Sequence, residues 1–300
     1  MPACSAHRPP GVAPAACPDA SAAVRILTFQ ARVCGPAALV RAAQALRPRA
    51  PAWTTTPPVV ASTTFAMRPD PLSLSGYQLL REGTPLDVIH PPRALLAALD
   101  TAITAAAVDV LSGQYLLIHA GAVAYADRSV LLPAAAGRGK STLVAGLLAA
   151  GCHYLSDEVA VLDPPTGRLL PFAKHLAIKR GGAAVLAQLY PELASSVPRL
   201  HDGREVVWYL PPPRGAWPAR PVPLRYVILP DYVPAAPTTL VPITRTDALA
   251  GVVQQACRLP AHGAAGFGSL VAAVREADCY ALTVGRLGPA VDQLLRLLDG

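Results

Sequence analysis

The chain has 300 residues, which excludes a peptide or mini-scaffold and suffices for one large domain or two modest ones. Only 15% of the residues are charged, and the net charge is +7. Arg carries nearly all of the positive charge, because Lys occurs only at positions 140, 174 and 179. Such a compositional bias is weak evidence for nucleic-acid binding, which relies on a clustered basic surface, and we predict no nucleic-acid partner.

The sequence carries no pattern typical of a zinc site or of a membrane segment. Its six cysteines include no CxxC pair and no zinc-finger spacing. No uninterrupted apolar run approaches the ~18–20 residues that cross a bilayer, and the N-terminus lacks the basic-then-apolar order of a secretory signal. We therefore expect a cytoplasmic protein with no membrane partner.

The first third of the chain predicts a tail and a small α+β unit. Residues 1–22 are Ala, Pro and Cys without periodicity, so we expect them to be disordered. Residues 23–110 form the predicted unit. Its elements are a strand over 26–32, a helix over 36–46, strands over 61–68 and 76–81, and a long helix over 92–110 with apolar residues at helical spacing.

Residues 111–300 predict a larger α/β domain. Strands over 115–124 and 129–133 are joined by a turn, and the second leads into a glycine-rich loop and a helix that ends at Gly151. This order, followed by short strands over 154–155 and 159–162, is typical of a P-loop core. Further helices are predicted over 182–189, 246–258, 269–277 and 289–298, and further strands over 206–210, 224–229, 239–241 and 280–284.

The glycine-rich loop matches the phosphate-binding pattern G-x-x-x-x-G-K-[ST] except at Ala134, which replaces the first Gly. Gly137 and Gly139 let the backbone wrap around an anion, and N–H groups at the start of the next helix point at phosphate. Lys140 supplies a compact cation for the β- and γ-phosphates, and Ser141 supplies a hydroxyl for Mg²⁺. The alternative is a glycine turn that caps an ordinary helix. We expect nucleotide contacts from the whole loop: Ala134, Ala135, Ala136, Gly137, Arg138, Gly139, Lys140, Ser141 and Thr142.

Two adjacent acids, Asp157 and Glu158, follow the loop by one helix and one short strand. A carboxylate next to the γ-phosphate can hold Mg²⁺ or accept the proton of an attacking hydroxyl. Together with Ser141 they are the predicted metal ligands. The alternative for this pair is a solvated turn.

Other nucleotide-binding classes fit less well. A guanine-specific GTPase needs an N-K-x-D motif, and none of the three lysines has Asp two positions later. The acid pair is also not preceded by the four consecutive apolar residues of a motor-ATPase strand.

The order and spacing of several motifs resemble the HPr kinase/phosphorylase family, and most closely its HPr-kinase-related branch found with peptide-modification systems. The matching segments are IHAGAV around His119, AAAGRGKST, LSDEVAVLD, Leu170-Pro171-Phe172 and the LAIK segment that ends at Lys179. The resemblance covers roughly residues 112–298. The sequence departs from it at Ala134, Ala136 and Glu158, and the Glu-x-Arg-Gly phosphorylase signature is missing.

The resemblance implies a P-loop kinase core of the HPr kinase/PEP carboxykinase type that uses ATP and Mg²⁺. It implies that Asp157 is the general base toward a serine-type hydroxyl, that His119 tunes or orients it, and that Lys179 neutralises the transferred phosphate. The substrate would be a precursor peptide, such as a lasso-type precursor, or an HPr-like carrier protein, and a homo-oligomer is possible.

Several alternatives remain open at this level. His119 on an apolar strand is also typical of a hydrogen-bonded core histidine, and Lys179 of a solvated strand end. The chain could instead be a small-molecule kinase or ATPase, or a non-catalytic nucleotide-binding scaffold.

Overall fold

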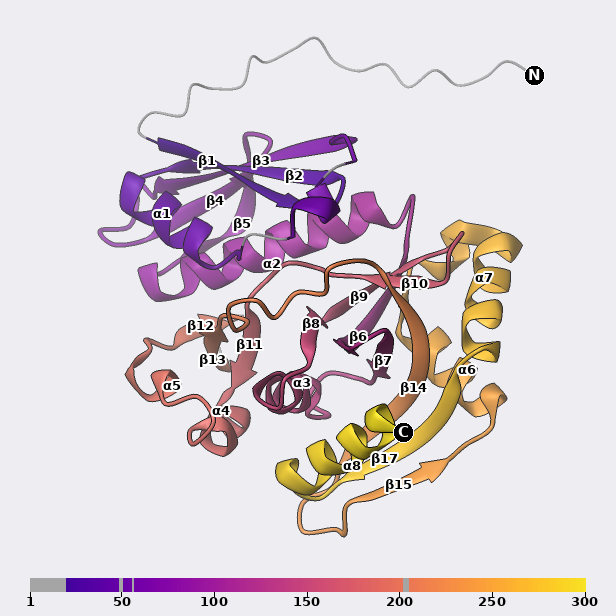
Figure 1. Ribbon diagram of the computed structural model, residues 1–300. Coiled ribbons are helices and arrows are strands. Elements are labelled where there is room, and N and C mark those ends of the chain that lie inside the picture. The colour runs from indigo at the N-terminus through magenta and orange to yellow at the C-terminus, as the bar shows by residue number, and fades with distance from the viewer. Residues whose placement is uncertain (1–19, 49–50, 56, 202–204) are drawn as a thin grey trace, which may run out of the picture.

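The computed structural model describes residues 20–48, 51–55, 57–201 and 205–300. In these residues the chain forms a mixed α/β molecule with a five-stranded, a nine-stranded and a three-stranded sheet. Figure 1 shows the N-terminal sheet lying on the long helix α2, with the larger sheet on the other side of that helix. The predicted α/β class is therefore confirmed. Residues 1–19 of the tail predicted over residues 1–22 lie outside the described residues.

The N-terminal sheet has the strand order β1-β2-β3-β4-β5, and only β2 and β3 run parallel. Its strands are β1 (Ala20–Ile26), β2 (Phe29–Gly35), β3 (Ala61–Pro69), β4 (Tyr77–Arg81) and β5 (Thr84–His90). The helices of this unit are α1 (Ala37–Ala45), a short 3-10 helix (Ala52–Thr55) and α2 (Pro92–Leu111).

The predicted strand over 26–32 is wrong, because this segment contains the turn of a hairpin. Ile26 pairs with Phe29, and Leu27 in the turn has a φ of 52°. A short apolar run does not by itself separate one strand from two strands with a tight turn. Residues 20–22 belong to β1, so the predicted disordered tail extends too far into the chain. The sequence also did not predict β5.

Helix α2 joins the N-terminal unit to the rest of the molecule. Its buried residues Leu95 and Leu99 belong to the same apolar cluster as Phe65 of β3 and as Leu117 and Val161, which lie in the large sheet. The predicted boundary near residue 110 therefore divides the chain but does not divide the hydrophobic core. Among the described residues, α2 is the one helix long and apolar enough to cross a membrane, and most of that stretch is buried inside the molecule.

The large sheet positions the glycine-rich loop. Its strand order is β10-β9-β6-β7-β14-β17-β15, with β8 and β16 also paired to β6. Strands β7, β14 and β17 run parallel, so their carboxyl ends lie at the same edge. The strands are β6 (Leu116–Tyr125), β7 (Arg128–Pro133), β8 (His153–Ser156), β9 (Val159–Asp163), β10 (Arg168–Leu170), β14 (Val222–Tyr232), β15 (Thr239–Pro242), β16 (Ala256–Cys257) and β17 (Asp278–Val284).

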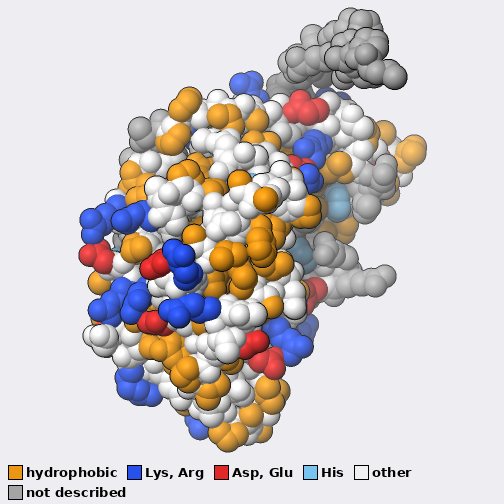
Figure 2. All heavy atoms as spheres, turned by 90° about the vertical axis from the view of Figure 1, so that its right-hand side faces the viewer, with side chains coloured by type: hydrophobic (Ala, Val, Ile, Leu, Met, Phe, Trp, Pro, Cys, Tyr) orange, Lys and Arg blue, Asp and Glu red, His pale blue; other side chains and the backbone are white. Residues whose placement is uncertain are grey.

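Helices cover both faces of this sheet. Val130 and Leu132 of β7 pack in the cluster that contains α3 (Lys140–Ala149) and α8 (Leu287–Asp299), whereas Leu131 packs in the cluster that contains α6 (Arg245–Gln255) and α7 (Gly263–Arg275). A parallel strand buried on both faces reads as a continuous apolar run, as β7 does. Figure 2 shows the side of the molecule seen from the right of Figure 1, where basic side chains are interspersed with acidic, hydrophobic and uncharged ones.

The third sheet lies next to α3 and contacts α2. Its order is β11-β13-β12, and all its pairings are antiparallel. It consists of β11 (Leu176–Lys179), β12 (Arg199–His201) and β13 (Glu205–Leu210), and the chain between β11 and β12 forms α4 (Arg180–Leu186) and α5 (Glu192–Ser195). The sequence predicted β11, β13 and a helix near α4, but not β10, β12 or α5.

Candidate functional site

The glycine-rich loop follows β7 directly and ends where α3 begins at Lys140. The two positive φ angles of the loop fall on Gly137 (84°) and Gly139 (83°), in the left-handed region that favours glycine. Ala134 is not among the residues with positive φ. Alanine at the first position of the pattern is therefore compatible with this backbone, and the loop keeps glycine where its conformation requires it.

The backbone of the loop is available to bind an anion. Among the described residues, the N–H groups of Gly139, Lys140, Ser141 and Thr142 have no protein acceptor, and the first bond of this turn runs from the Leu143 N–H to the Gly139 carbonyl. The side of the loop from Ala135 to Arg138 is exposed. Unpaired N–H groups at the start of a helix, shaped by left-handed glycines, are a favourable site for phosphate.

The Lys140 side chain folds onto the loop. Its Nζ donates to the Ala134 carbonyl at 2.6 Å and to the Ala135 carbonyl at 3.0 Å, and the residue is only 6% exposed. Burial lowers the pKa of this amine to about 8, while Asp157 and Glu158 oppose the shift. The amine and the two predicted acids therefore lie near one another.

Asp157 lies in the short turn between β8 and β9 and is 2% exposed. One carboxylate oxygen accepts a hydrogen bond from the Tyr154 hydroxyl at 2.9 Å, and the other accepts one from the Ala177 N–H of β11 at 3.1 Å. Burial raises the pKa of Asp157, with Lys174 opposing the shift. The carboxylate is thus held in one orientation, and its affinity for a proton is above that of an exposed aspartate.

Glu158 forms an ion pair with Lys174, a residue that the sequence reasoning did not assign to the site. The Lys174 side chain is 3% exposed, whereas that of Glu158 is 43% exposed. The lysine lowers the pKa of Glu158 to about 2, so this carboxylate stays ionised and partly open to solvent. The rarity of lysine in the chain was the only sequence signal for Lys174.

His119 lies on β6 beside the acid pair. Its register partner is Val159, the residue after Glu158, and the Ala120 N–H donates to the Glu158 carbonyl at 3.1 Å. Burial lowers the pKa of His119, and a hydrogen bond to Gln255 and the charge of Glu158 oppose the shift. The imidazole therefore lies near the acids, and it is also partly buried and hydrogen-bonded, as a core histidine would be.

The remaining predicted residues lie around the loop with different partners. Lys179 is exposed and pairs with Glu205 at 2.9 Å, yet its charge still lowers the pKa of Lys140. Arg138 reaches from the loop to Asp231 at the end of β14, at 2.5 Å. The structure thus brings Lys140, His119, Asp157, Glu158 and Lys179 to one region, although they come from four separate segments.

The donor atoms in this region suit Mg²⁺ better than a transition metal. The described residues hold no group of three or more His, Cys, Asp or Glu side chains that could bind a metal without help. The Ser141 hydroxyl and the carboxylates of Asp157 and Glu158 are hard oxygen donors. Mg²⁺ is commonly held by one or two carboxylates together with substrate phosphates and water, so the residues present fit it.

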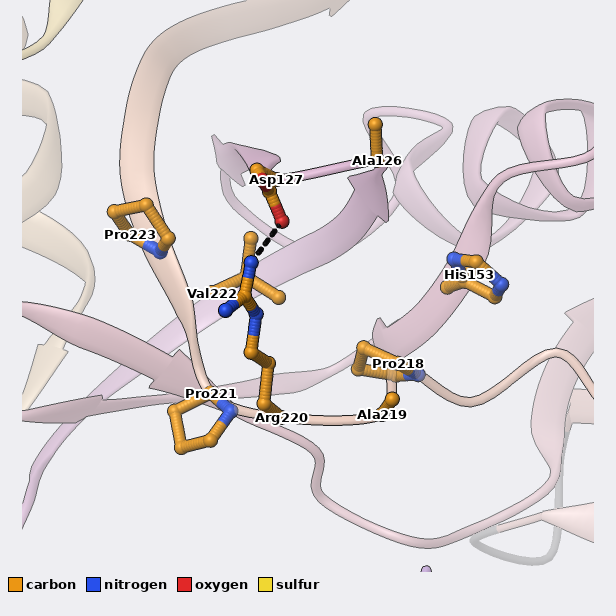
Figure 3. Close-up of a pocket in the computed structure, with 9 residues that line it drawn as sticks. All are labelled: Ala126, Asp127, His153, Pro218, Ala219, Arg220, Pro221, Val222 and Pro223. Carbon is orange, nitrogen blue, oxygen red and sulfur yellow. Dashed lines mark hydrogen bonds and ion pairs between the residues drawn. The ribbon is translucent and has the colours of Figure 1, made fainter.

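The structure also contains a pocket of about 210 Å³ at the opposite end of β7 from the loop. Figure 3 shows the Asp127–Arg220 ion pair across it, with His153 on one side. Both charged side chains are mostly exposed, and the rest of the lining is Ala, Val and Pro. This pocket has no part in the arrangement around Lys140.

Comparison with known proteins identifies no relative, since no family model matches the chain and no curated protein matches it. The function is therefore inferred from the residues and their geometry.

Proposed function

We propose that this protein is an ATP- and Mg²⁺-dependent kinase that transfers the γ-phosphoryl group to a serine-type hydroxyl of a peptide or protein, as the resemblance to the HPr-kinase-related branch implies. One observation carries the proposal: unpaired loop N–H groups and Lys140 lie next to a buried, oriented aspartate. A glycine turn that only caps a helix does not call for a buried lysine and two acids beside it.

In this proposal the loop N–H groups and Lys140 bind the β- and γ-phosphates of ATP. Ser141, Asp157 and Glu158 would hold Mg²⁺, which neutralises phosphate charge when bound. Lys179 at the end of β11, whose charge already acts on Lys140, would neutralise the transferred group, as the resemblance implies. These interactions position the phosphates and leave the proton of the acceptor hydroxyl as the remaining chemical task.

Asp157 accepts that proton. The hydroxyl oxygen forms a bond to the γ-phosphorus, the bond from the γ-phosphorus to the β–γ bridging oxygen breaks, and ADP leaves with the electron pair. Each carboxylate oxygen of Asp157 accepts one hydrogen bond from the protein and retains a second lone pair. The raised pKa of Asp157 makes it a better base than an exposed aspartate.

The test measures binding and transfer separately. ATP titration with and without Mg²⁺ should show Mg²⁺-dependent binding in the parent protein and much weaker binding in Lys140→Ala. Incubation with γ-labelled ATP and a panel of serine-containing peptides and small carrier proteins should then label at least one of them. An Arg41→Met variant on the exposed side of α1 is the matched control and should behave like the parent.

Other outcomes would contradict the proposal. ATP hydrolysis without labelling of any peptide or carrier would favour a simple ATPase, and labelling of a metabolite would favour a small-molecule kinase. A parent protein that does not bind Mg-ATP would favour a scaffold. Light scattering of the same samples tests the proposed homo-oligomer.

A further inference from the structure

A chain of buried charges runs from the N-terminal unit to the acid pair. Arg47 follows α1, and its Nη2 atom lies 2.6 Å from the Asp100 carboxylate on α2. The other oxygen of Asp100 lies 3.8 Å from the Nζ atom of Lys174, and Lys174 pairs with Glu158. Four separate segments of the chain thus meet beside the acid pair.

The inner members of this chain are shielded from water. The side chains of Arg47, Lys174 and Asp100 are 3%, 3% and 9% exposed. The Nη2 atom of Arg47 also donates to the Asp100 carbonyl at 3.0 Å and to the Thr104 hydroxyl at 2.8 Å, which ties it to α2 at three points. Buried ions at such sites interact strongly, because little water screens them.

Lys174 is the shared member. It is the cation paired with Glu158 on one side and with Asp100 on the other, and its charge also acts on Asp157. Replacement by an uncharged residue would leave Asp100, Glu158 and Asp157 close together without this cation. Glu158, whose side chain is already partly exposed, would then turn toward water or toward Lys140.

We propose that Lys174 is a positioning residue for the acid pair, and that Arg47 and Asp100 of the N-terminal unit hold its ammonium in place. This inference rests on the proposed function and assigns the N-terminal unit a part in it. Lys174 acts through Glu158 and Asp157 and does not itself touch the nucleotide. The glycine-rich loop, which would bind the phosphates, takes its conformation from its own residues and does not depend on these buried charges.

If the buried charges position the acid pair, the kinetics of the variants should differ from those expected if the charges only stabilise the fold. Loss of a group that supports metal-binding or catalytic residues commonly lowers metal affinity or activity by about 10–100-fold. Lys174→Met should therefore lower kcat by about 10–100-fold, with KM for ATP changed by less than about threefold. A purely structural role would lower kcat only in proportion to the fraction of folded protein.

A double variant separates these cases. Lys174→Met should also lower the melting temperature, because Glu158 and Asp157 lose this cation while Asp100 keeps Arg47. Adding Asp100→Asn leaves Arg47 and Glu158 as the remaining opposite charges, and the Asn oxygen can still accept from Arg47, so Lys174→Met/Asp100→Asn should recover part of the melting temperature but not kcat. Lys174→Arg keeps the charge and should retain more activity than Lys174→Met.

Two variants of Arg47 test the contribution of the N-terminal unit. This test does not depend on the folding of any Lys174 variant. All three Arg47 contacts use Nη2, so the single ammonium of Arg47→Lys can replace them, whereas Arg47→Met cannot. We expect kcat to fall in Arg47→Met and to recover in Arg47→Lys, with Arg41→Met on the exposed side of the preceding helix α1 as the control.

The outcomes distinguish this inference from the proposed function. An active parent in which Lys174→Met/Asp100→Asn and Arg47→Met keep kcat within twofold of the parent would overturn the positioning role alone. A parent that neither binds nor turns over Mg-ATP would overturn the proposed function and the positioning role together.

Discussion

The glycine-rich loop and the acid pair lie in one region of the molecule, but they are stabilised in different ways. The loop is one continuous segment whose conformation depends on two left-handed glycines and the first turn of α3. The acid pair is a turn between β8 and β9 whose partners come from β8, the segment before β11, and β11 itself, and Asp100 of α2 in turn pairs with Lys174 of that segment. The conformation of the loop is therefore a local property, whereas the charge and orientation of the acids depend on the whole fold.

The largest expected effect is on the acid side. Asp157→Asn keeps the shape of the side chain and removes the base, so phosphoryl transfer should fall by about 10²–10⁴-fold while Mg-ATP still binds. Single-turnover transfer and equilibrium nucleotide binding measure the two quantities. Transfer at the parental rate would show that another residue accepts the proton.

The corresponding substitution in the loop, Lys140→Ala, should mainly lower the affinity for ATP. Lys140→Ala removes a charged contact to phosphate, which contributes about 1.5–3 kcal/mol, or about 10–150-fold in affinity. Titration with a fluorescent ATP analogue checks this. Unchanged affinity and turnover would refute the assignment of phosphate binding to the loop, and with it the proposed division of roles between the loop and the acid pair.

The buried region should also respond to pH. Burial lowers the pKa of His175, next to Lys174, to about 4 from an ordinary value of 6.5, and the charges of Arg47 and Lys174 add to this effect against Asp100. The unfolded chain therefore binds a proton between these values that the folded chain does not. Stability contributed by neutral His175 is complete above pH 6.5 and is lost as the pH falls toward 4.

Replacement of His175 should remove this dependence. The loss in the parent is on the order of 2 kcal/mol, and His175→Gln should be less sensitive to acid over the same range. Chemical denaturation of both proteins at pH 7, 5.5 and 4.5 measures the difference. Parallel stability curves for the two proteins would mean that His175 is not held neutral by the fold.

The smallest effect is expected where the loop departs from its sequence pattern. Because Ala134 does not have a positive φ, Ala134→Gly relieves no strain, and nucleotide affinity should change by less than about twofold. Gly137→Ala provides the contrast, since its φ of 84° disfavours a side chain. A large gain in affinity for Ala134→Gly would show that alanine at this position does impair the loop.

Much of the α/β order was predictable from local patterns. The helices over 37–45, 92–111 and 287–299 and the strands β6 and β7 that precede the loop lie close to their predicted bounds, because each repeats an apolar pattern over several residues. The hairpin of β1 and β2 was predicted as one strand, since pairing between neighbours leaves no periodic trace. Short elements such as β10, β12 and α5 depend on their packing partners.

The sequence by itself determined the glycine-rich loop and its conformation, because its residues are consecutive and the backbone angles they favour are intrinsic to them. It also indicated the two acids through their spacing from the loop, and His119 through the family resemblance. Only the tertiary structure decided that Asp157 is buried, that Glu158 is paired with Lys174, and that Arg47 and Asp100 support this lysine. The reason is physical: a charge takes its pKa and its orientation from groups within a few ångströms, and folding, not sequence distance, brings those groups together.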